Sequence, residues 1–272
     1  MSYANFIPQV WSEALQREQE RKRVFAEDCN RQWEGEIKQK GDTVHILGVG
    51  RPNIYTANKG AEIIEDPEEV ANSTVALVID QVRYFNFMVG DIDRAQAVNG
   101  LMDALTKEAA EGLANAEDIY IAGMASRITN IVTQNDLNES NVLETIDTAV
   151  EKLYLLDVNP STELVLTVSP KFYTRFKRAY IGKDTDNSEY MKNGRVGKYG
   201  NVTIKISNNV YTNEGKEYLM LRSKRAIAFA SQLTEIEAYR PEKRFADAVK
   251  GMSLFGAQIV RPEEICNLVV KY

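Results

Sequence analysis

The sequence contains few of the residues that enzymes and metal sites most often use for chemistry. It has one histidine, His45, and two cysteines, Cys29 and Cys266, among 272 residues. A Ser–His–Asp or Cys–His site would have to use His45, which stands in an alternating strand pattern without a nucleophile signature around any serine or cysteine. One histidine and two distant cysteines also argue against a zinc site. We therefore expect no catalytic residue, metal or cofactor, and interpret both cysteines as small packing residues in a reducing compartment.

Long hydrophobic runs are also absent. No stretch approaches the ~20 apolar residues of a membrane span, and the first residues lack the basic region and apolar core of a secretory signal. The net charge of −6 argues against a dedicated nucleic-acid-binding protein, whose surface is usually basic. It does not exclude a protein that surrounds nucleic acid. With 44% hydrophobic and 26% charged residues, the chain has an ordinary globular composition.

The pattern over residues 6–30 predicts a helix that begins near Pro8. Its first half has one apolar stripe, formed by Ile7, Val10, Trp11, Ala14 and Leu15. From residue 16 to residue 23 the sequence is polar on every side. Because such a helix has no apolar face for its own domain to bury, we expect it to be solvated or to lie against a partner.

Two stretches have the alternation of half-buried β-strands. The first lies within residues 33–46, where Val44 and Ile46 alternate with polar residues. The second runs from residue 74 to residue 89 and would span roughly 50 Å at ~3.3 Å per residue. With the loop-like residues 51–73 between them, the two strands predict a long two-stranded arm. An isolated hairpin is marginally stable in water, so we expect another surface to cover this arm.

The strongest helical pattern begins at Asp91 or Asp93 and extends to about Ala125. Apolar residues recur there at spacings of three and four, at Val98, Met102, Leu105, Ala109, Leu113, Ala116 and Tyr120. The helix would be on the order of 50 Å long. Paired aspartates hold divalent metals in some transferases, but aspartate is also favoured at a helix start by capping and by the helix dipole, and we favour capping here.

The rest of the chain predicts a mixed middle region followed by strands. The expected elements are a helix from an Asn141/Glu144 capping box to Leu156, a buried strand at 163–168, a helix at 171–180 capped by Ser169 and Pro170, a loop at 182–200, a strand at 201–206 and a run of short strands from 225 to the end. The middle is therefore α/β, and the long helix with the last strands suggests an α+β unit built from distant segments.

Several blocks of the sequence, in this order, resemble the major capsid protein of tailed bacteriophages with the Hong Kong 97-type fold. NFIPQVWS, NRQWEGEIKQKGDTVHI and LVIDQVRYFNFMVGDID resemble the N-arm, the extended loop and the start of the spine helix. KRAIAFASQLTEIEAYRPEKRFADAVKGMSLFGAQIVRPEEI is similar to the peripheral-domain strands. No single block is as diagnostic as a zinc-ligand pattern, but the resemblance covers essentially the whole chain.

The resemblance implies an α+β Hong Kong 97-type capsid fold with five segments. They are an N-arm at 1–32, an extended β-hairpin loop at 33–73, the second arm strand and long spine helix at 74–135 as the first part of a peripheral domain, an α/β axial domain at 136–222, and the second part of the peripheral domain at 223–272. The extended loop would lie over a neighbouring subunit, and the axial domain would surround the axis of a ring of subunits.

The implied function is that of a structural protein, not an enzyme. The chain would self-assemble through pentamers and hexamers into the icosahedral shell that encloses the double-stranded DNA genome of a tailed phage. It would be found in the virion capsid after assembly in the host bacterial cytoplasm, without a membrane. Because the chain enters the N-arm within its first residues, we expect it to remain essentially full length and to use a separate scaffolding protein. A portal protein and a decoration protein are further expected partners.

The residues expected at subunit interfaces are apolar residues of the two arms, with ordinary packing within one chain as the alternative. They are Trp11, Phe25, Trp33, Ile37, Val44, Ile46, Phe85 and Phe87. Lysines of the extended loop form isopeptide cross-links in some family members, and the candidates here are Lys38, Lys40 and Lys59. The alternative, which we favour, is that these lysines keep an exposed strand edge soluble.

Basic clusters could contact packaged DNA without reading its sequence. They lie at residues 21–23 and at Arg175, Lys177 and Arg178. We favour the alternative that they pair with acidic neighbours. Two other functions stay open: an encapsulin-like compartment shell, which shares the fold, and a cytoplasmic metal-dependent α/β enzyme that uses Asp91 and Asp93.

Overall fold

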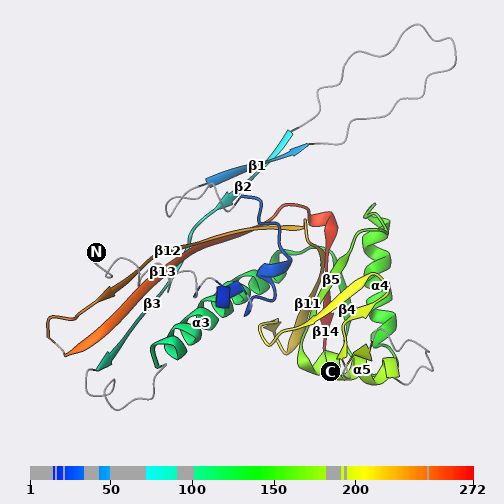
Figure 1. Ribbon diagram of the computed structural model, residues 1–272. Coiled ribbons are helices and arrows are strands. Elements are labelled where there is room, and N and C mark those ends of the chain that lie inside the picture. Colours follow the sequence, from blue (N-terminus) through cyan, green and yellow to red (C-terminus); the bar gives the residue numbers. More distant parts are fainter. Residues whose placement is uncertain are drawn as a thin grey trace, which may run out of the picture.

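The computed structural model in Figure 1 describes residues 15–33 except 16 and 21, 43–49, 72–90, 101–181, 191–192, 195–243 and 245–272. Several residues singled out above lie outside these ranges, namely Trp11, Ile37, Lys38, Lys40, Lys59, Asp91 and Asp93. The described residues form three regions, which we call the axial part, the peripheral part and the arm. No helix among these residues is both long enough and apolar enough to span a bilayer.

The axial part is a seven-stranded sheet with helices beside it (Figure 1). Its strand order is β4 (Ile131–Gln134), β14 (Ile265–Val270), β11 (Lys216–Ser223), β5 (Leu164–Val168), β9 (Val202–Ile206) and β8 (Lys198–Tyr199), and β10 (Tyr211–Asn213) also pairs with β11. The helices α4 (Val142–Leu155) and α5 (Pro170–Ile181) contribute to its core. Because β4 and β14 join this sheet, it takes strands from outside the expected 136–222, and the division into domains stays a prediction.

The expected local elements of the axial part are present. Every residue of β5 is buried, as expected for the strand at 163–168. Ser169 accepts a hydrogen bond from the backbone N–H of Phe172 at 3.2 Å, so it caps α5 as predicted. The prediction of a capping box for α4 is wrong, because the Asn141 side chain makes no capping hydrogen bond. It instead accepts a hydrogen bond from the N–H of Asn138 and donates one to the carbonyl of Asp136.

The peripheral part is a long three-stranded antiparallel sheet with one helix along it (Figure 1). The sheet order is β12 (Ile227–Tyr239), β13 (Ala246–Ile259) and β3 (Gln81–Gly90), and the helix is α3 (Leu101–Gly123). The prediction of short strands after residue 225 is wrong, because β12 and β13 have 13 and 14 residues. Each pairs along nearly its whole length, which joins fragments that looked separate in the sequence.

The buried face of α3 differs from the predicted stripe. The buried residues are Ala110, Leu113, Ala114, Glu117, Asp118, Ile121 and Ala122. Ala109, Ala116 and Tyr120, which the spacing placed on the buried face, are only partly buried. The stripe is displaced because two acidic residues, which usually lie at the surface, occupy the inner face of the helix.

The arm consists of β1 (Thr43–Val49) and β2 (Asn72–Val78), which pair in antiparallel register. The prediction of one strand from 74 to 89 is wrong, because the chain leaves one sheet after Val78 and enters the other at Gln81, where β3 pairs with β13. Between them Ile79 is fully buried. A Cβ atom at Gly256 of β13 would lie 2.2 Å from the carbonyl oxygen of Val78, so only glycine lets the chain cross there.

Two short strands, β6 (Met191–Lys192) and β7 (Arg195–Val196), pair within the region expected to be a loop. Three 3₁₀ helices complete the described elements: η2 (Ala26–Asp28), η4 (Met124–Arg127) and η5 (Pro262–Glu264). All three lie near the place where the axial and peripheral parts meet, and η4 directly extends α3 toward β4.

Candidate subunit interfaces

The N-terminal helical residues are held by the chain's own α3. Gln19 donates to Glu117 Oε1 at 2.8 Å, and Arg23 donates through Nε to Glu117 Oε2 at 2.6 Å. Gln19, Arg23 and Glu117 are all buried. The expectation of a solvated or partner-covered stretch is therefore wrong for Gln19 and Arg23, because these two side chains bind a buried carboxylate of the same chain. Arg17, Glu20 and Lys22 are exposed, as expected.

The predicted helix over 6–30 is also too long, because helical residues end at Lys22 and η2 follows. Asp118 gives the reason. Its carboxylate accepts hydrogen bonds from the backbone N–H groups of Val24, Phe25 and Ala26 at 2.8, 2.9 and 3.1 Å. These donors would otherwise bond to carbonyls of the preceding turn, so Asp118 redirects the chain out of the helix.

Burial dominates the electrostatics of this contact. It raises the pKa of Glu117, against the lowering effect of the adjacent Arg23 guanidinium. It also raises the pKa of Asp118, against the three backbone N–H groups that favour the charged carboxylate. A buried charge is tolerated only with such partners, so Gln19, Arg23 and residues 24–26 are bound closely to α3.

Three of the predicted interface residues are already buried within one chain. Phe25, Val44 and Ile46 have 1%, 8% and 6% of their surface exposed. Phe25 lies in the core where the axial and peripheral parts meet, and Val44 and Ile46 pack with Leu77 against β12 and β13. Contact with a neighbouring subunit is not needed to bury them, and their role in such a contact stays a prediction.

The other described candidates are partly buried. The rings of Phe85 and Phe87 stack with centroids 5.9 Å apart and pack against a cluster that includes Leu15, Leu113 and Val249. Trp33 packs partly against the base of the arm. These three side chains retain exposed surface, so both alternatives, packing within the chain and contact between chains, apply to them.

Sequence reasoning missed the most exposed apolar residues. Tyr84 of β3 is 79% exposed, and Phe245, in the turn between β12 and β13, is 87% exposed. Tyr84 alternates with the inward-facing Phe85 and Phe87, so β3 carries large aromatic side chains on both faces. Aromatic residues at successive positions of this strand were the sequence signal that could have identified Tyr84 as an exposed aromatic residue. Apolar residues on the outer face of an edge strand are typical of a surface that another chain covers.

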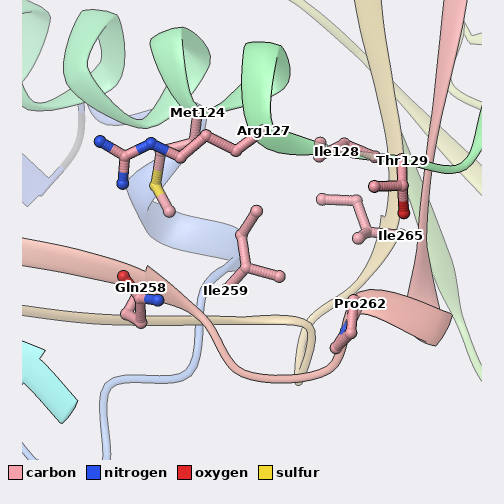
Figure 2. Close-up of a pocket in the computed structure, with 8 residues that line it drawn as sticks. All are labelled: Met124, Arg127, Ile128, Thr129, Gln258, Ile259, Pro262 and Ile265. Carbon is pink, nitrogen blue, oxygen red and sulfur yellow. The ribbon is translucent and has the colours of Figure 1, made fainter. Parts of the chain in front are cut away.

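Two hollows lie near the meeting point of the parts. The larger, of about 1320 Å³, separates the arm from the axial part and is lined by Trp33, Ile46 and Val75 on one side and by residues 156–159 and 260–264 on the other. The smaller, of about 220 Å³, is shown in Figure 2. Its walls carry the apolar side chains of Met124, Ile128, Ile259, Pro262 and Ile265, with Arg127 and Gln258 also lining it.

The larger hollow is lined by charged side chains, among them Asp157, Lys224 and Glu264. The residues that the structure describes contain no group of three or more His, Cys, Asp or Glu side chains placed to hold a metal. His45 is exposed on β1, as the alternation predicted. Burial raises the pKa of Cys29 and of Cys266 to about 11, so both thiols stay protonated and unreactive near neutral pH.

The basic clusters have acidic or aromatic neighbours. Arg23 binds Glu117, as described above. The Lys22 Nζ atom lies 3.0 Å from Glu111 Oε2. Arg178 lies 2.9 Å from Glu139, and the Arg175 guanidinium lies 4.4 Å from the ring centroid of Tyr272. These pairs favour the interpretation of neutralised surface charge, while contact with DNA stays untested.

No family model and no curated protein matches the sequence. Solved structures do match. One from Mycobacterium phage Che8 has 25% identity and a TM-score of 0.75, with 90% of each chain covered. The capsid structure of the cyanophage P-SCSP1u has 13% identity and a TM-score of 0.72, with 91% of this chain and 88% of that one covered. A virus-like particle from Pyrococcus furiosus has 15% identity and a TM-score of 0.59, with 98% and 100% covered.

Proposed function

We propose that this chain, which has the fold of tailed-phage capsid proteins, is a major capsid protein that assembles through pentamers and hexamers into an icosahedral shell around double-stranded DNA. The observation that carries the proposal is the match to phage structures over about nine-tenths of both chains, with a TM-score of 0.75 for the Mycobacterium phage structure. The predicted α+β capsid fold is confirmed at the level of its sheets and helices.

The uncovered surface of the single chain supports this proposal. The peripheral sheet has α3 on one face, whereas Tyr84 stands exposed on the other face, and in the described residues no strand pairs with the second edge of β3. Head-to-tail contacts between identical chains close into rings when the rotation allows. Many modest contacts acting together then make a shell that is difficult to dismantle.

The proposed contacts involve both the predicted residues and the exposed ones. The groove between the arm and the axial part, which Trp33 lines, would receive a neighbouring subunit. The exposed surface of Phe85 and Phe87, together with Tyr84 and Phe245, would complete contacts along the peripheral part. For Phe25, Val44 and Ile46 the contribution would be indirect, because they fix the elements that carry the contact.

The proposed partners and location follow from the same assignment. A separate scaffolding protein would guide assembly in the host bacterial cytoplasm, a portal protein would occupy one vertex, and a decoration protein could bind outside. Packaged DNA would touch the inner surface without sequence readout, since such contacts need only tolerate phosphates. The axial part would surround the capsomer axis.

A second candidate function is an encapsulin-like compartment shell. The match to the virus-like particle from Pyrococcus furiosus over 98% of this chain favours it specifically. The two functions differ in contents, because a compartment encloses cargo protein and a phage head encloses DNA. Nuclease-protected DNA in purified particles supports the phage assignment, and a co-purifying enzyme supports the compartment.

Electron microscopy after size exclusion tests assembly directly, first for the chain alone and then with a candidate scaffolding protein. Closed shells, tubes or capsomer rings are expected, and their size gives the subunit number. Tyr84→Asp should abolish these forms, whereas Thr174→Asp, on the exposed side of α5, should retain them. A compact monomer under both conditions would contradict the proposal.

A further inference from the structure

The axial and peripheral parts are joined by three short connections. They are residues 224–226 between β11 and β12, residues 260–264 between β13 and β14, and residues 128–130 between η4 and β4. A shared apolar core fills the junction, with side chains from α3, β11, β12, β13 and β14. Three narrow connections do not by themselves fix the angle between two sheets, so other contacts across the junction matter.

Residues 24–30, which we call the elbow, cross this junction without belonging to either sheet. On the peripheral side, Asp118 of α3 accepts the N–H groups of Val24, Phe25 and Ala26. Asn30 donates its N–H to the carbonyl of Ile227 at 2.8 Å and accepts from the N–H of Phe229 at 2.9 Å. Both ends of the elbow are therefore bonded to the peripheral part through backbone groups.

The middle of the elbow is bonded to the axial part. Arg222 of β11, which is fully buried, donates through Nη2 to the carbonyl of Phe25 at 2.8 Å, and its guanidinium lies 5.4 Å from the Phe25 ring centroid. Lys205 of β9 forms ion pairs with the elbow: its Nζ atom lies 2.6 Å from Asp28 Oδ2 and 2.7 Å from Glu27 Oε2. Rotation of the axial part would break these bonds or drag the elbow away from Asp118.

The cavity of Figure 2 lies beside the shared core of this junction and is partly open to solvent. Its lining comes from η4, the two residues after it, the end of β13, η5 and the start of β14, and none of its eight lining residues belongs to the elbow. Because this space of about 220 Å³ holds no protein atoms, the side chains around it have room to rearrange.

We propose that the elbow is a clamp that sets the angle between the axial and peripheral parts, with Asp118 and Arg222 as its two positioning residues. With both bonds in place, the parts move as one body. With either bond lost, the axial part rotates about the three connections, and the cavity supplies the free volume. This inference does not depend on the proposed function.

The angle can be measured as a distance between two spin labels on the full chain. Thr174→Cys on α5 and Lys243→Cys in the turn after β12 place labels at exposed sites on the two parts. The native thiols of Cys29 and Cys266 are buried and protonated, so they will not take up label. If the chain assembles, labelled protein is diluted into unlabelled protein. The unaltered elbow should give one narrow distance distribution.

Asp118→Asn should broaden this distribution and shift its centre, because an amide cannot accept three N–H groups as the carboxylate does. Arg222→Met should do the same, and Arg222→Lys should partly restore the narrow distribution, since lysine keeps one donor for the Phe25 carbonyl. Leu153→Ala is the matched control: it removes buried axial packing away from the elbow, so it should lower stability without moving the distance.

An unchanged centre and width in Asp118→Asn and Arg222→Met would overturn the proposal, as would equal broadening in Leu153→Ala. If neither elbow variant folds, Lys205→Met removes the partly exposed bond to Asp28 and should still broaden the distribution. A narrow distribution in that variant would count against the clamp.

Discussion

The axial and peripheral parts bury their strands differently. In the axial part, every residue of β5 and β14 is buried, so both faces of the central sheet are covered by the same chain. In the peripheral part, β3 alternates between the inward Phe85 and Phe87 and the exposed Tyr84. The axial part buries both faces of its central strands within one chain, whereas the peripheral part leaves Tyr84 exposed on one face of its sheet. The difference locates where a single chain is sufficient and where another chain would add stability.

The N-terminal segment is the exception within the peripheral part, and it gives the largest expected effect on folding. Replacing Arg23 by Met leaves the Glu117 carboxylate buried without its cation, which typically costs ~3–5 kcal/mol of unfolding free energy. Lys22→Met is the matched control, because its partner Glu111 is half exposed and screening makes such pairs weak. Urea unfolding of both variants measures the difference, and equal losses would contradict the buried contact.

The same variant has a defined pH dependence. Burial raises the pKa of Glu117 above its ordinary 4.5 in the folded state, so the proton binds the folded chain more tightly than the unfolded chain. Stability from this group is therefore present below pH 4.5 and is lost as the pH rises through the raised folded pKa. Without Arg23 the pKa rises further, so the destabilisation should be larger at neutral than at acidic pH. A loss that is independent of pH would contradict this assignment.

A core substitution sharpens the comparison between the two sheets. Leu166→Ala in β5 removes a fully buried side chain and should cost ~2–5 kcal/mol. Tyr84→Ala in β3 should cost far less in the isolated chain, because exposed positions usually change stability by no more than ~0.5 kcal/mol. Denaturant unfolding under identical conditions compares them. Similar losses would show that β3 is covered within one chain after all.

Sequence reasoning succeeded where local signals decide the structure. The strand at 163–168 and the helix after Ser169 were predicted because a buried run and a cap lie next to one another in the chain. The break at Ile79 was missed because both halves of 74–89 have the same strand pattern. What separates them is Gly256 of β13, which comes from a distant part of the sequence and allows the close backbone crossing.

The buried polar contact of the N-terminal helix was missed for a related reason. Glu117 and Arg23 are 94 residues apart, and each alone looks like a surface residue. Acidic residues on a helix are expected to face water, so the predicted stripe of α3 was displaced from the real one. The candidate interface residues were chosen because they are apolar, but residues of the core are apolar too. Only the exposed fraction of the side chain, which the sequence does not show, distinguishes Tyr84 and Phe245 from the buried Phe25.

A smaller effect is expected at the cap of α5 in the axial part. Ser169→Ala removes the acceptor for the Phe172 N–H and should cost ~1 kcal/mol, the usual value for such a cap. Asn141→Ala at the start of α4 should not act as a cap substitution, because that side chain bonds the preceding loop instead. Thermal unfolding and the helix signal in circular dichroism separate the two. Loss of α4 helicity in Asn141→Ala would contradict the observed bonding.

The smallest effect on folding is expected at the exposed tip of the peripheral ribbon. Phe245→Ser should change the unfolding free energy by no more than ~0.5 kcal/mol, because an exposed side chain loses little on removal. It should nevertheless raise the protein concentration at which particles form, since Phe245 is 87% exposed in the turn between β12 and β13. These two strands extend away from the axial part (Figure 1). Leu155→Ser, at a site 78% exposed on α4 of the axial part, is the comparison. Light scattering during assembly should show the larger change for Phe245→Ser, because the peripheral sheet is the part whose covering is incomplete. A larger change for Leu155→Ser would place the dominant contact around the axial part instead.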